Sequence, residues 1–183
     1  MSTRAFPKPD NDEERVAFLE SLALIDSAPD KNFDRITELT QHVFSVPIAA
    51  VTLLDRDRQW FKCIIGMEAD EVGRDAAVCN YTIMQDDVFE IPDLSADERS
   101  RELPMVTGDP HLRYYAGVPL TVNGFKLGSL CILDTETRQS LDARERTILR
   151  ELAALVVREI TVQSIIKESL ALMSSRADTR LPD

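Results

Sequence analysis

The sequence predicts an α+β domain in which an antiparallel sheet is flanked by helices from the two ends of the chain. Helical periodicity is confined to the first 44 residues and to the segment after residue 140. Between these segments, short β-branched and aliphatic runs alternate with polar turns. One pair of runs surrounds Asn123-Gly124, the strongest short-range signal for a hairpin and therefore for antiparallel pairing.

The composition is that of one globular domain. The chain has 183 residues, of which 44% are hydrophobic and 29% are charged. Its net charge of −11 argues against binding to nucleic acid or to an anionic membrane, because neutralising phosphates requires clustered Lys and Arg. The N-terminus has no apolar secretory segment, and the longest apolar runs are too short to span a bilayer. We therefore expect a cytoplasmic protein with no nucleic-acid or membrane partner.

The cysteines and histidines indicate neither a disulfide framework nor a metal site. Cys63, Cys79 and Cys131 are odd in number and far apart, which is typical of a reducing compartment. The only histidines, His42 and His111, do not lie at metal-ligand spacing from any cysteine. No P-loop or GxGxxG motif is present. The sequence therefore identifies no cofactor and no metal.

The helical segments set the expected domain boundaries. We expect a flexible tail over residues 1–10, a single domain over residues 11–173 and a flexible polar tail over residues 174–183. Asn11 and Glu14 have the spacing of a capping box for the first helix. Asp30, which follows a proline, is expected to cap a second helix that ends near residue 44.

The strands are expected in the middle of the chain. Residues 46–55 and 59–66 read as two strands joined by a short polar turn, and residues 88–93 read as another short strand. Residues 94–110 are polar and interrupted by prolines, so we expect a loop with a single helical turn.

The hairpin around Asn123-Gly124 defines an expected register. A type I′ turn there pairs Ala116 with Cys131 and Arg113 with Asp134, and the second pair would form a cross-strand ion pair. One face of this hairpin is apolar enough to sit against helices. The other face is mixed and includes glycines, which often mark the close approach of another group. It carries Tyr115, Gly117, Pro119, Thr121, Lys126, Gly128, Leu130, Ile132 and Asp134.

The last element is a long helix. Ser140 is expected to cap a helix from Leu141 to about Met173, roughly 50 Å long. Apolar residues follow 4-3 spacing along it, as in a coiled coil. They are Ile148, Leu152, Leu155, Val162, Ile166 and Met173. The second half of the helix either frays or pairs with a second subunit, and we favour a homodimer.

Five motifs in order give the chain a family resemblance. They are RDRQWFK (56–62), GRDAAVC (73–79), PDLSADER (92–99), RYYAGVPL (113–120) and LGSLCILD (127–134). From about Glu13 to Ile160 the chain resembles the GAF domain, and in particular the bacterial GAF modules found alone or ahead of histidine kinase and cyclic-nucleotide signalling domains. The resemblance implies a sheet of about six strands with helices on one face and a loop-roofed small-molecule pocket on the other. It also implies dimerisation through the terminal helices.

The chain departs from the family pattern where the pocket roof is expected. Relatives often have His at the position of Tyr81 and Phe at the position of Ser100. The ligand of a relative therefore does not carry over to this chain.

Seven residues are the candidates for ligand binding. Tyr115 points to the mixed face, and Cys79 is either a pocket thiol or a small buried hydrophobe. Trp60 precedes Phe61, so one of these two aromatics faces the core and the other the pocket. Arg74 lies in a solvated turn or forms a loop clasp. The complete set is Tyr115, Cys79, Asp93, Trp60, Arg74, Asp97 and Asp134, in which the three aspartates are expected around the pocket mouth.

We interpret the chain as a non-catalytic, ligand-sensing or regulatory module of bacterial signal transduction, dimeric and acting on a signalling protein in trans. One alternative is an enzyme like the free methionine-(R)-sulfoxide reductases, which use paired cysteines in a different motif context. Another is a bilin photosensor, although Cys79 is followed by Asn80 rather than by the typical His. The last is a dimerisation domain with a vestigial pocket.

Overall fold

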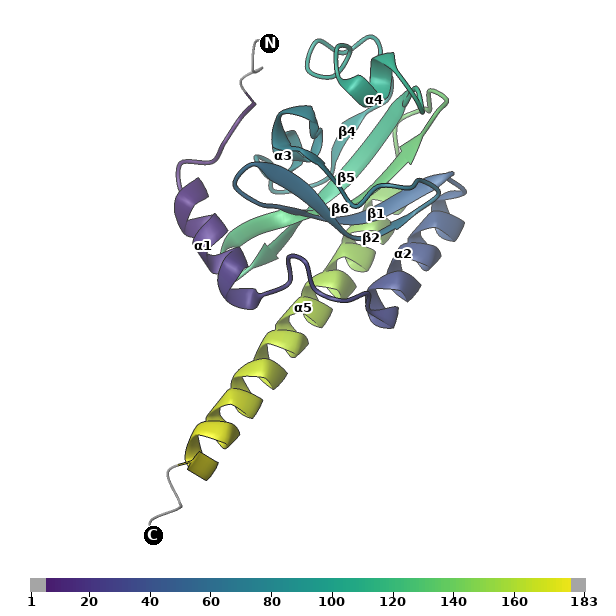
Figure 1. Ribbon diagram of the computed structural model, residues 1–183. Coiled ribbons are helices and arrows are strands. Elements are labelled where there is room, and N and C mark those ends of the chain that lie inside the picture. The colour runs from purple at the N-terminus through teal and green to yellow at the C-terminus, as the bar shows by residue number, and fades with distance from the viewer. Residues whose placement is uncertain (1–5, 179–183) are drawn as a thin grey trace.

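The computed structural model describes residues 6–178, and within them it shows a six-stranded antiparallel sheet with the long helices packed on one face (Figure 1). The strand order is β3-β2-β1-β6-β5-β4. The strands are Ile48–Leu54 (β1), Arg58–Ile65 (β2), Glu71–Gly73 (β3), Phe89–Ile91 (β4), Tyr114–Val122 (β5) and Phe125–Asp134 (β6). The predicted α+β class and the sheet of about six strands are confirmed. Strand β3 lies in a segment for which the sequence predicted no element.

Helices from both ends of the chain cover one face of the sheet, and the middle of the chain covers the other. The first group is α1 (Asp12–Leu22), α2 (Lys31–Phe44) and α5 (Ala143–Asp178). The second group is the 3-10 turn η1 (Arg74–Ala76) with α3 (Cys79–Thr82) and α4 (Pro104–Thr107). Each face of the sheet has its own cluster of buried apolar side chains. None of the helices in residues 6–178 is long and apolar enough to cross a membrane.

Asn11 and Asp30 occupy the N-cap positions of α1 and α2, as predicted, whereas the predicted start of α5 is wrong. Asp30 caps α2 as expected, because its carboxylate accepts a hydrogen bond from the Asn32 amide at 2.8 Å. The Asn11 side chain makes no capping hydrogen bond, so the predicted capping box of α1 is wrong. Helix α5 begins at Ala143 rather than Leu141, and its capping box consists of Asp142 and Glu145, which exchange two hydrogen bonds of 2.8 Å.

The predicted tails lie partly outside the described residues, which exclude 1–5 and 179–183. The Phe6 ring lies 5.2 Å from the guanidinium carbon of Arg74, so residues 6–10 contact the domain. Residues 174–178 belong to α5, which continues past the expected end at Met173.

The hairpin turn is confirmed, but the register beyond it is wrong. Asn123 and Gly124 have positive φ values of 49° and 84°, as a type I′ turn requires. Farther from the turn, Gly117 rather than Ala116 lies opposite Cys131. The cause is a bulge next to Pro119, where β6 contains one residue more than β5.

The bulge changes which side chains of β6 face the helices. An extra residue reverses the alternation of a strand, so every side chain beyond it points to the opposite face. Leu130 and Ile132 therefore join the core under the helices, although the sequence placed them on the mixed face. Cys131 and Leu133 join Tyr115 on the face covered by the middle of the chain.

Gly128 lies at this bulge, against strand β1. A Cβ atom built on it would stand 1.9 Å from the Thr52 carbonyl oxygen, which is backbone and cannot rotate away. At Gly124 in the hairpin turn, a Cβ would meet no atom within 4 Å. The two glycines of the hairpin are thus needed for different reasons, close approach at Gly128 and positive φ at Gly124.

We expect Gly128→Ala to destabilise the fold more than Gly124→Ala does. The first substitution forces β1 and β6 apart, and we expect a loss of about 3 kcal/mol or more, the upper range for overpacking. The second strains only the turn and is expected to cost about 1 kcal/mol. Denaturant unfolding of both variants measures the difference. Equal losses would show that β1 does not press on Gly128.

Candidate functional site

The face opposite the long helices contains a small closed cavity instead of an open pocket. Its volume is about 20 Å³, which is room for about one water molecule. It lies between β2, β6 and the α3–α4 segment, on the face where the sequence placed a pocket. The lining residues are Gln59, Phe61, Ile64, Met67, Val78, Cys79, Met105, Cys131 and Leu133.

Cys79, the first residue of α3, lies at the centre of a buried polar cluster beside this cavity. Its sulfur accepts hydrogen bonds from Ser129 Oγ at 3.1 Å, Tyr115 Oη at 3.3 Å and Thr52 Oγ1 at 3.5 Å. The Tyr115 hydroxyl also bonds Thr82 Oγ1 at 2.6 Å. Three strands supply the hydroxyl groups, and the bulge in β6 is what turns Ser129 toward them.

The cluster favours an ionised Cys79. Burial raises the pKa of the Cys79 thiol, but its hydrogen bonds lower the pKa by more, to about 6. The donors are Cys131, Ser129, Tyr115 and Thr52. The hydrogen bond to Cys79, together with burial, raises the pKa of Cys131 well above its ordinary value. These shifts favour a thiolate on Cys79 over one on Cys131.

Gln59 is a member of the site that the sequence analysis missed. The residue is buried and lines the cavity, and its Oε1 atom has no hydrogen-bond partner among residues 6–178. A buried carbonyl without a donor is costly, so this oxygen is the acceptor that Gln59 offers to a hydrogen-bond donor in the cavity. The only sequence signal was its place in the RDRQWFK motif, next to the aromatic pair.

The two adjacent aromatics of β2 lie on opposite faces of the sheet, as predicted. Phe61 lines the cavity. Trp60 packs with the core under the helices, where the Lys62 ammonium lies 5.8 Å from its ring centroid. Trp60 was the predicted ligand-binding residue of the two, but it lies on the face away from the cavity.

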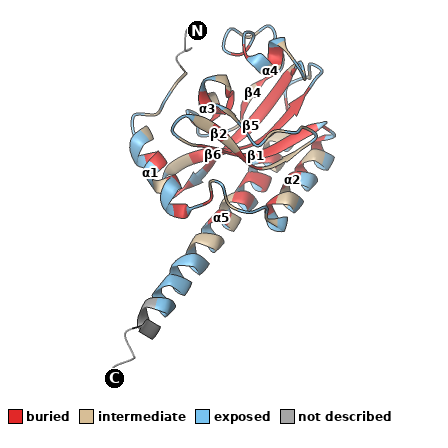
Figure 2. Ribbon diagram, in the orientation of Figure 1, coloured by how far each residue is buried: buried red, intermediate tan, exposed pale blue. Residues whose placement is uncertain are grey.

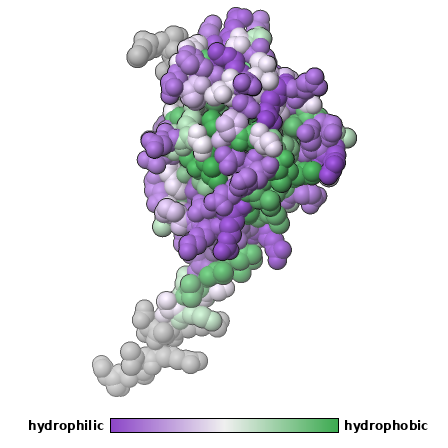
Figure 3. Space-filling view, turned by 90° about the vertical axis from the view of Figure 1, so that its right-hand side faces the viewer, coloured by the Kyte–Doolittle hydropathy of each residue, from purple (hydrophilic) through white to green (hydrophobic). Residues whose placement is uncertain are grey.

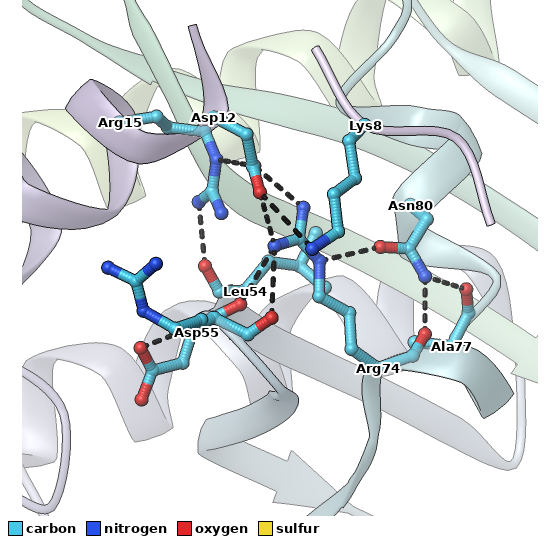
Figure 4. Close-up of polar contacts among 9 residues, drawn as sticks. Lys8, Asp12, Arg15, Leu54, Asp55, Arg74, Ala77 and Asn80 are labelled. Atoms are coloured by element: carbon cyan, nitrogen blue, oxygen red, sulfur yellow. Dashed lines mark hydrogen bonds and ion pairs between the residues drawn. The ribbon is translucent and has the colours of Figure 1, made fainter. Parts of the chain in front are cut away.

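Arg74 forms a loop clasp, and its partner is Asp12 rather than its neighbour Asp75 (Figure 4). Its two terminal nitrogens each lie 2.8 Å from an Asp12 carboxylate oxygen, and one also donates to the Asp55 carbonyl at 3.0 Å. Its Nε donates to the Asn80 side chain at 2.9 Å. Arg74 does not line the cavity, but through Asn80 it holds the helix that carries Cys79.

Asp93 and Asp97 organise the loop that follows β4. Asp93 accepts hydrogen bonds from the Ser95 amide at 2.9 Å and the Ser95 hydroxyl at 2.6 Å. Asp97 pairs with Arg99 at 2.6 Å, and the Arg99 guanidinium carbon lies 5.0 Å from the ring centroid of Phe89. Neither aspartate lines the cavity.

The predicted ion pair of Arg113 with Asp134 is wrong. The Asp134 carboxylate bonds Arg138 Nε at 2.7 Å. The Arg113 side chain donates to backbone carbonyls, among them that of Leu112 at 2.9 Å. The one-residue shift of register is the reason, since Tyr114 rather than Arg113 pairs with Asp134 in the sheet. Of the seven predicted residues, the structure brings together only Cys79 and Tyr115.

The Asp12 clasp makes stability depend on pH. Burial raises the pKa of Asp12, but the hydrogen bonds from Arg74 and Arg15 lower it by more. The pKa of Asp12 therefore lies below its ordinary value of 3.8. A carboxylate with a depressed pKa stabilises the fold above its unfolded-state pKa, about 3.9. We expect this contribution to be lost as the pH falls below about 4. Asp12→Asn should lack this part of the acid dependence and lose about 3 kcal/mol at neutral pH.

Urea unfolding at a series of pH values measures both effects. The matched control is Asp10→Asn, which changes an exposed carboxylate two residues away. If Asp12→Asn and Asp10→Asn unfold with the same free energy at neutral pH, the clasp does not stabilise the fold.

The state of Cys79 gives a second pH prediction. We expect the thiolate absorbance in the ultraviolet to rise with a midpoint at about pH 6. The step should be absent from Cys79→Ala and present in Cys63→Ala, because burial raises the pKa of Cys63 to about 11. A wild-type protein that titrates only in the alkaline range would contradict the proposed thiolate.

Comparison with known proteins identifies the fold and the family. The family model "GAF domain" matches residues 28–160. The cyclic di-GMP phosphodiesterase PA2567 of Pseudomonas aeruginosa is 38% identical over 155 residues, which cover 84% of this chain and 26% of that protein. The chain thus spans about a quarter of the length of this curated relative.

Solved structures agree with this family. The GAF domain of an Acinetobacter phosphoenolpyruvate-protein phosphotransferase has a TM-score of 0.58 and 16% identity, covering 84% of this chain and 95% of that one. Free methionine-R-sulfoxide reductase from Neisseria meningitidis has a TM-score of 0.60 and 17% identity, covering 91% of this chain and 99% of that one. At these identities the likeness concerns the fold alone. With a six-stranded antiparallel sheet under three helices and the family match over residues 28–160, the chain belongs to the GAF domain family.

Proposed function

We propose that this chain is a regulatory GAF module of bacterial signal transduction that works as a homodimer and senses a small molecule, without catalysis of its own. The observation that carries the proposal is the apolar stripe of α5, which continues beyond the sheet and is about half exposed within residues 6–178. A relative that is a cyclic di-GMP phosphodiesterase supports a role in signalling. Its partner, besides a second copy, would be a signalling protein acted on in trans.

The stripe changes from buried to exposed along one face of α5. Leu152 and Val156 are buried against the sheet. Val162, Ile166 and Leu170, spaced four residues apart, are 41%, 54% and 59% exposed. Residues at this spacing share one face of a helix. Figure 2 shows the distal part of α5 as exposed, and Figure 3 shows hydrophobic surface at the junction of helix and domain.

Helix α2 extends this apolar surface. Its Leu39 and Val43 are nearly half exposed, and α2 packs along α5. Apolar area in water costs about 25 cal/mol per Å² relative to a buried position. A second copy presenting the same face would bury both stripes at once, as the apolar faces of paired helices do in a coiled coil. The stripe and the adjoining face of α2 therefore support the homodimer.

Hydrogen bonds join the beginning of α5 to the strands that carry the site. Tyr114, the neighbour of Tyr115, donates from its hydroxyl to Glu90 at 2.9 Å. The Leu141 amide donates to the same carboxylate at 2.8 Å, and Arg146 of α5 forms an ion pair with it. A change in the packing of Tyr115 would therefore shift its neighbour Tyr114, and through Glu90 it would alter the contacts at the start of α5. This arrangement supports a module in which the cavity and the dimer helix act together.

The closed cavity defines what a ligand must do. A volume of about 20 Å³ admits a water and nothing larger, so a ligand would displace the α3–α4 segment from the sheet. The hydrogen-bond acceptors that it would meet are the sulfur of Cys79 and the unpartnered oxygen of Gln59. The rival interpretation is a dimerisation domain with a vestigial pocket. It predicts the same dimer but no bound ligand.

Native mass spectrometry of the purified protein, followed by the denatured mass, separates these interpretations. We expect a dimer that carries a small additional mass, lost on denaturation. A dimer whose native mass equals twice the denatured chain, and to which no added metabolite binds, would favour the vestigial pocket.

We expect Leu170→Glu to convert the dimer to a monomer, because it places a charge in the proposed apolar interface. The matched control is Ala171→Glu, which adds the same charge one residue on, rotated about 100° around the helix. Sedimentation velocity at several concentrations measures both. A monomeric wild-type protein, or a dimer that survives Leu170→Glu, would overturn the role of the stripe.

A further inference from the structure

Two buried arginines share one carboxylate where α1 begins (Figure 4). Arg15 and Arg74 are each 1% exposed. Asp12 accepts from Arg15 Nε at 2.8 Å and binds Arg74 with both oxygens, while the Lys8 ammonium lies 4.0 Å away. The two guanidinium groups therefore share the Asp12 carboxylate, and the Asp55 carboxylate also attracts Arg15.

Arg15 also keeps one donor without an acceptor. Its Nε is bonded to Asp12, and its Nη1 donates to the Leu54 carbonyl at 2.6 Å. Its Nη2 is buried and has no hydrogen-bond partner in the described part of the chain. A buried donor left unpaired costs about 1–3 kcal/mol, and more when it is charged. Nη2 is therefore the donor of Arg15 that remains for a ligand.

Arg15 lines a pocket of about 320 Å³ at the end of the sheet, between α1, the segment after α3 and the β5–β6 turn. This volume lies within the range of small-molecule sites. The other lining residues are Pro9, Asn11, Ile83, Met84, Asp86, Gly124 and Lys126. None of them lines the cavity beside Cys79, so the two sites are distinct.

The pocket offers a second cation. Lys126 Nζ lies 2.6 Å from Asp86, whose side chain is 98% exposed. An ion pair this exposed contributes little, so a ligand can replace Asp86 at small cost. Asn11 precedes α1 at the pocket wall and its side chain makes no capping bond, but the Asp12 amide already donates to the Pro9 carbonyl at 3.0 Å and the first turn of α1 is acidic, so the helix end is not counted as a donor.

We propose that this pocket binds the oxyanion group, phosphate or carboxylate, of a small molecule, with Arg15 Nη2 and Lys126 Nζ as its donors. The anion would supply the acceptor that Arg15 Nη2 lacks. The net charge of −11 opposes attraction of anions from a distance, so binding depends on these short-range donors. The proposal is independent of the sensing role and the dimer proposed above.

The test is an NMR titration of the full chain with inorganic phosphate, and separately with succinate, at constant ionic strength. We expect saturable shifts of the Arg15 Nε–H signal and of the Gly124 amide. Saturation with phosphate alone assigns the site to phosphate groups, with succinate alone to carboxylates, and with both to either oxyanion. Absence of saturation with both probes overturns the proposal.

Surface variants make the test specific without disturbing the buried arginines. We expect Lys126→Met to raise the Kd for the anion about threefold, because it removes the ammonium donor. We expect Asp86→Asn to lower the Kd by a similar factor, because it frees the Lys126 ammonium from its ion pair. The control Lys31→Met removes an equal charge on α2, and we expect the Kd to stay unchanged. If the three variants bind with the same Kd, the ion is adventitious or binds elsewhere, and the proposal fails.

Discussion

The structure depends on the close contact between β1 and β6 at Gly128. The bulge there adds one residue to β6 and reverses the direction of every side chain that follows. Without it, Ser129, Cys131 and Leu133 would face the helices, and Leu130 and Ile132 would face the cavity. The contact requires a residue without a Cβ, because the Thr52 carbonyl occupies that position. One glycine thus decides the composition of both cores.

The second constraint is the clasp between α1 and the middle of the chain. Asp12 and Arg74 are 62 positions apart in the sequence, and their bidentate pair fixes the turn that precedes α3. Asn80 ties α3 to this turn, because its side chain accepts a hydrogen bond from Arg74 Nε and donates to the Arg74 and Ala77 carbonyls. The clasp therefore lies between the two candidate sites. On one side it supports the helix that carries Cys79, and on the other it leaves Arg15 with an unused donor.

The two candidate sites and the long helix α5 lie at different places around one sheet. The cavity lies under α3 and α4, and α5 lies on the opposite face, bonded to β4 and β5 through Glu90. Such an arrangement suits a regulatory module, because a ligand on one face can alter the packing of a helix on the other. Helix α5 leaves the domain on the side away from the cavity, so the proposed dimer and a proposed ligand would not compete for surface (Figure 1).

The sequence by itself determined the features that depend on neighbours along the chain. The turn at Asn123-Gly124, the cap at Asp30 and the alternation of Trp60 with Phe61 are all local preferences of a few consecutive residues. The motifs likewise determined the family and the face on which the cavity lies. The capping box of α5 is formed by Asp142 and Glu145, which are also close in the sequence. The sequence analysis chose Ser140 as the cap instead.

Only the tertiary structure decided the register beyond the bulge, the partner of Arg74 and the closure of the cavity. At the bulge, β6 pairs with β5 on one side and with β1 on the other. The sequence of the hairpin alone does not reveal where β1 pairs. Arg74 selects Asp12 over the adjacent Asp75 because folding buries both partners together, where an ion pair with good geometry is required. Contacts between distant segments set these outcomes, and local preference cannot.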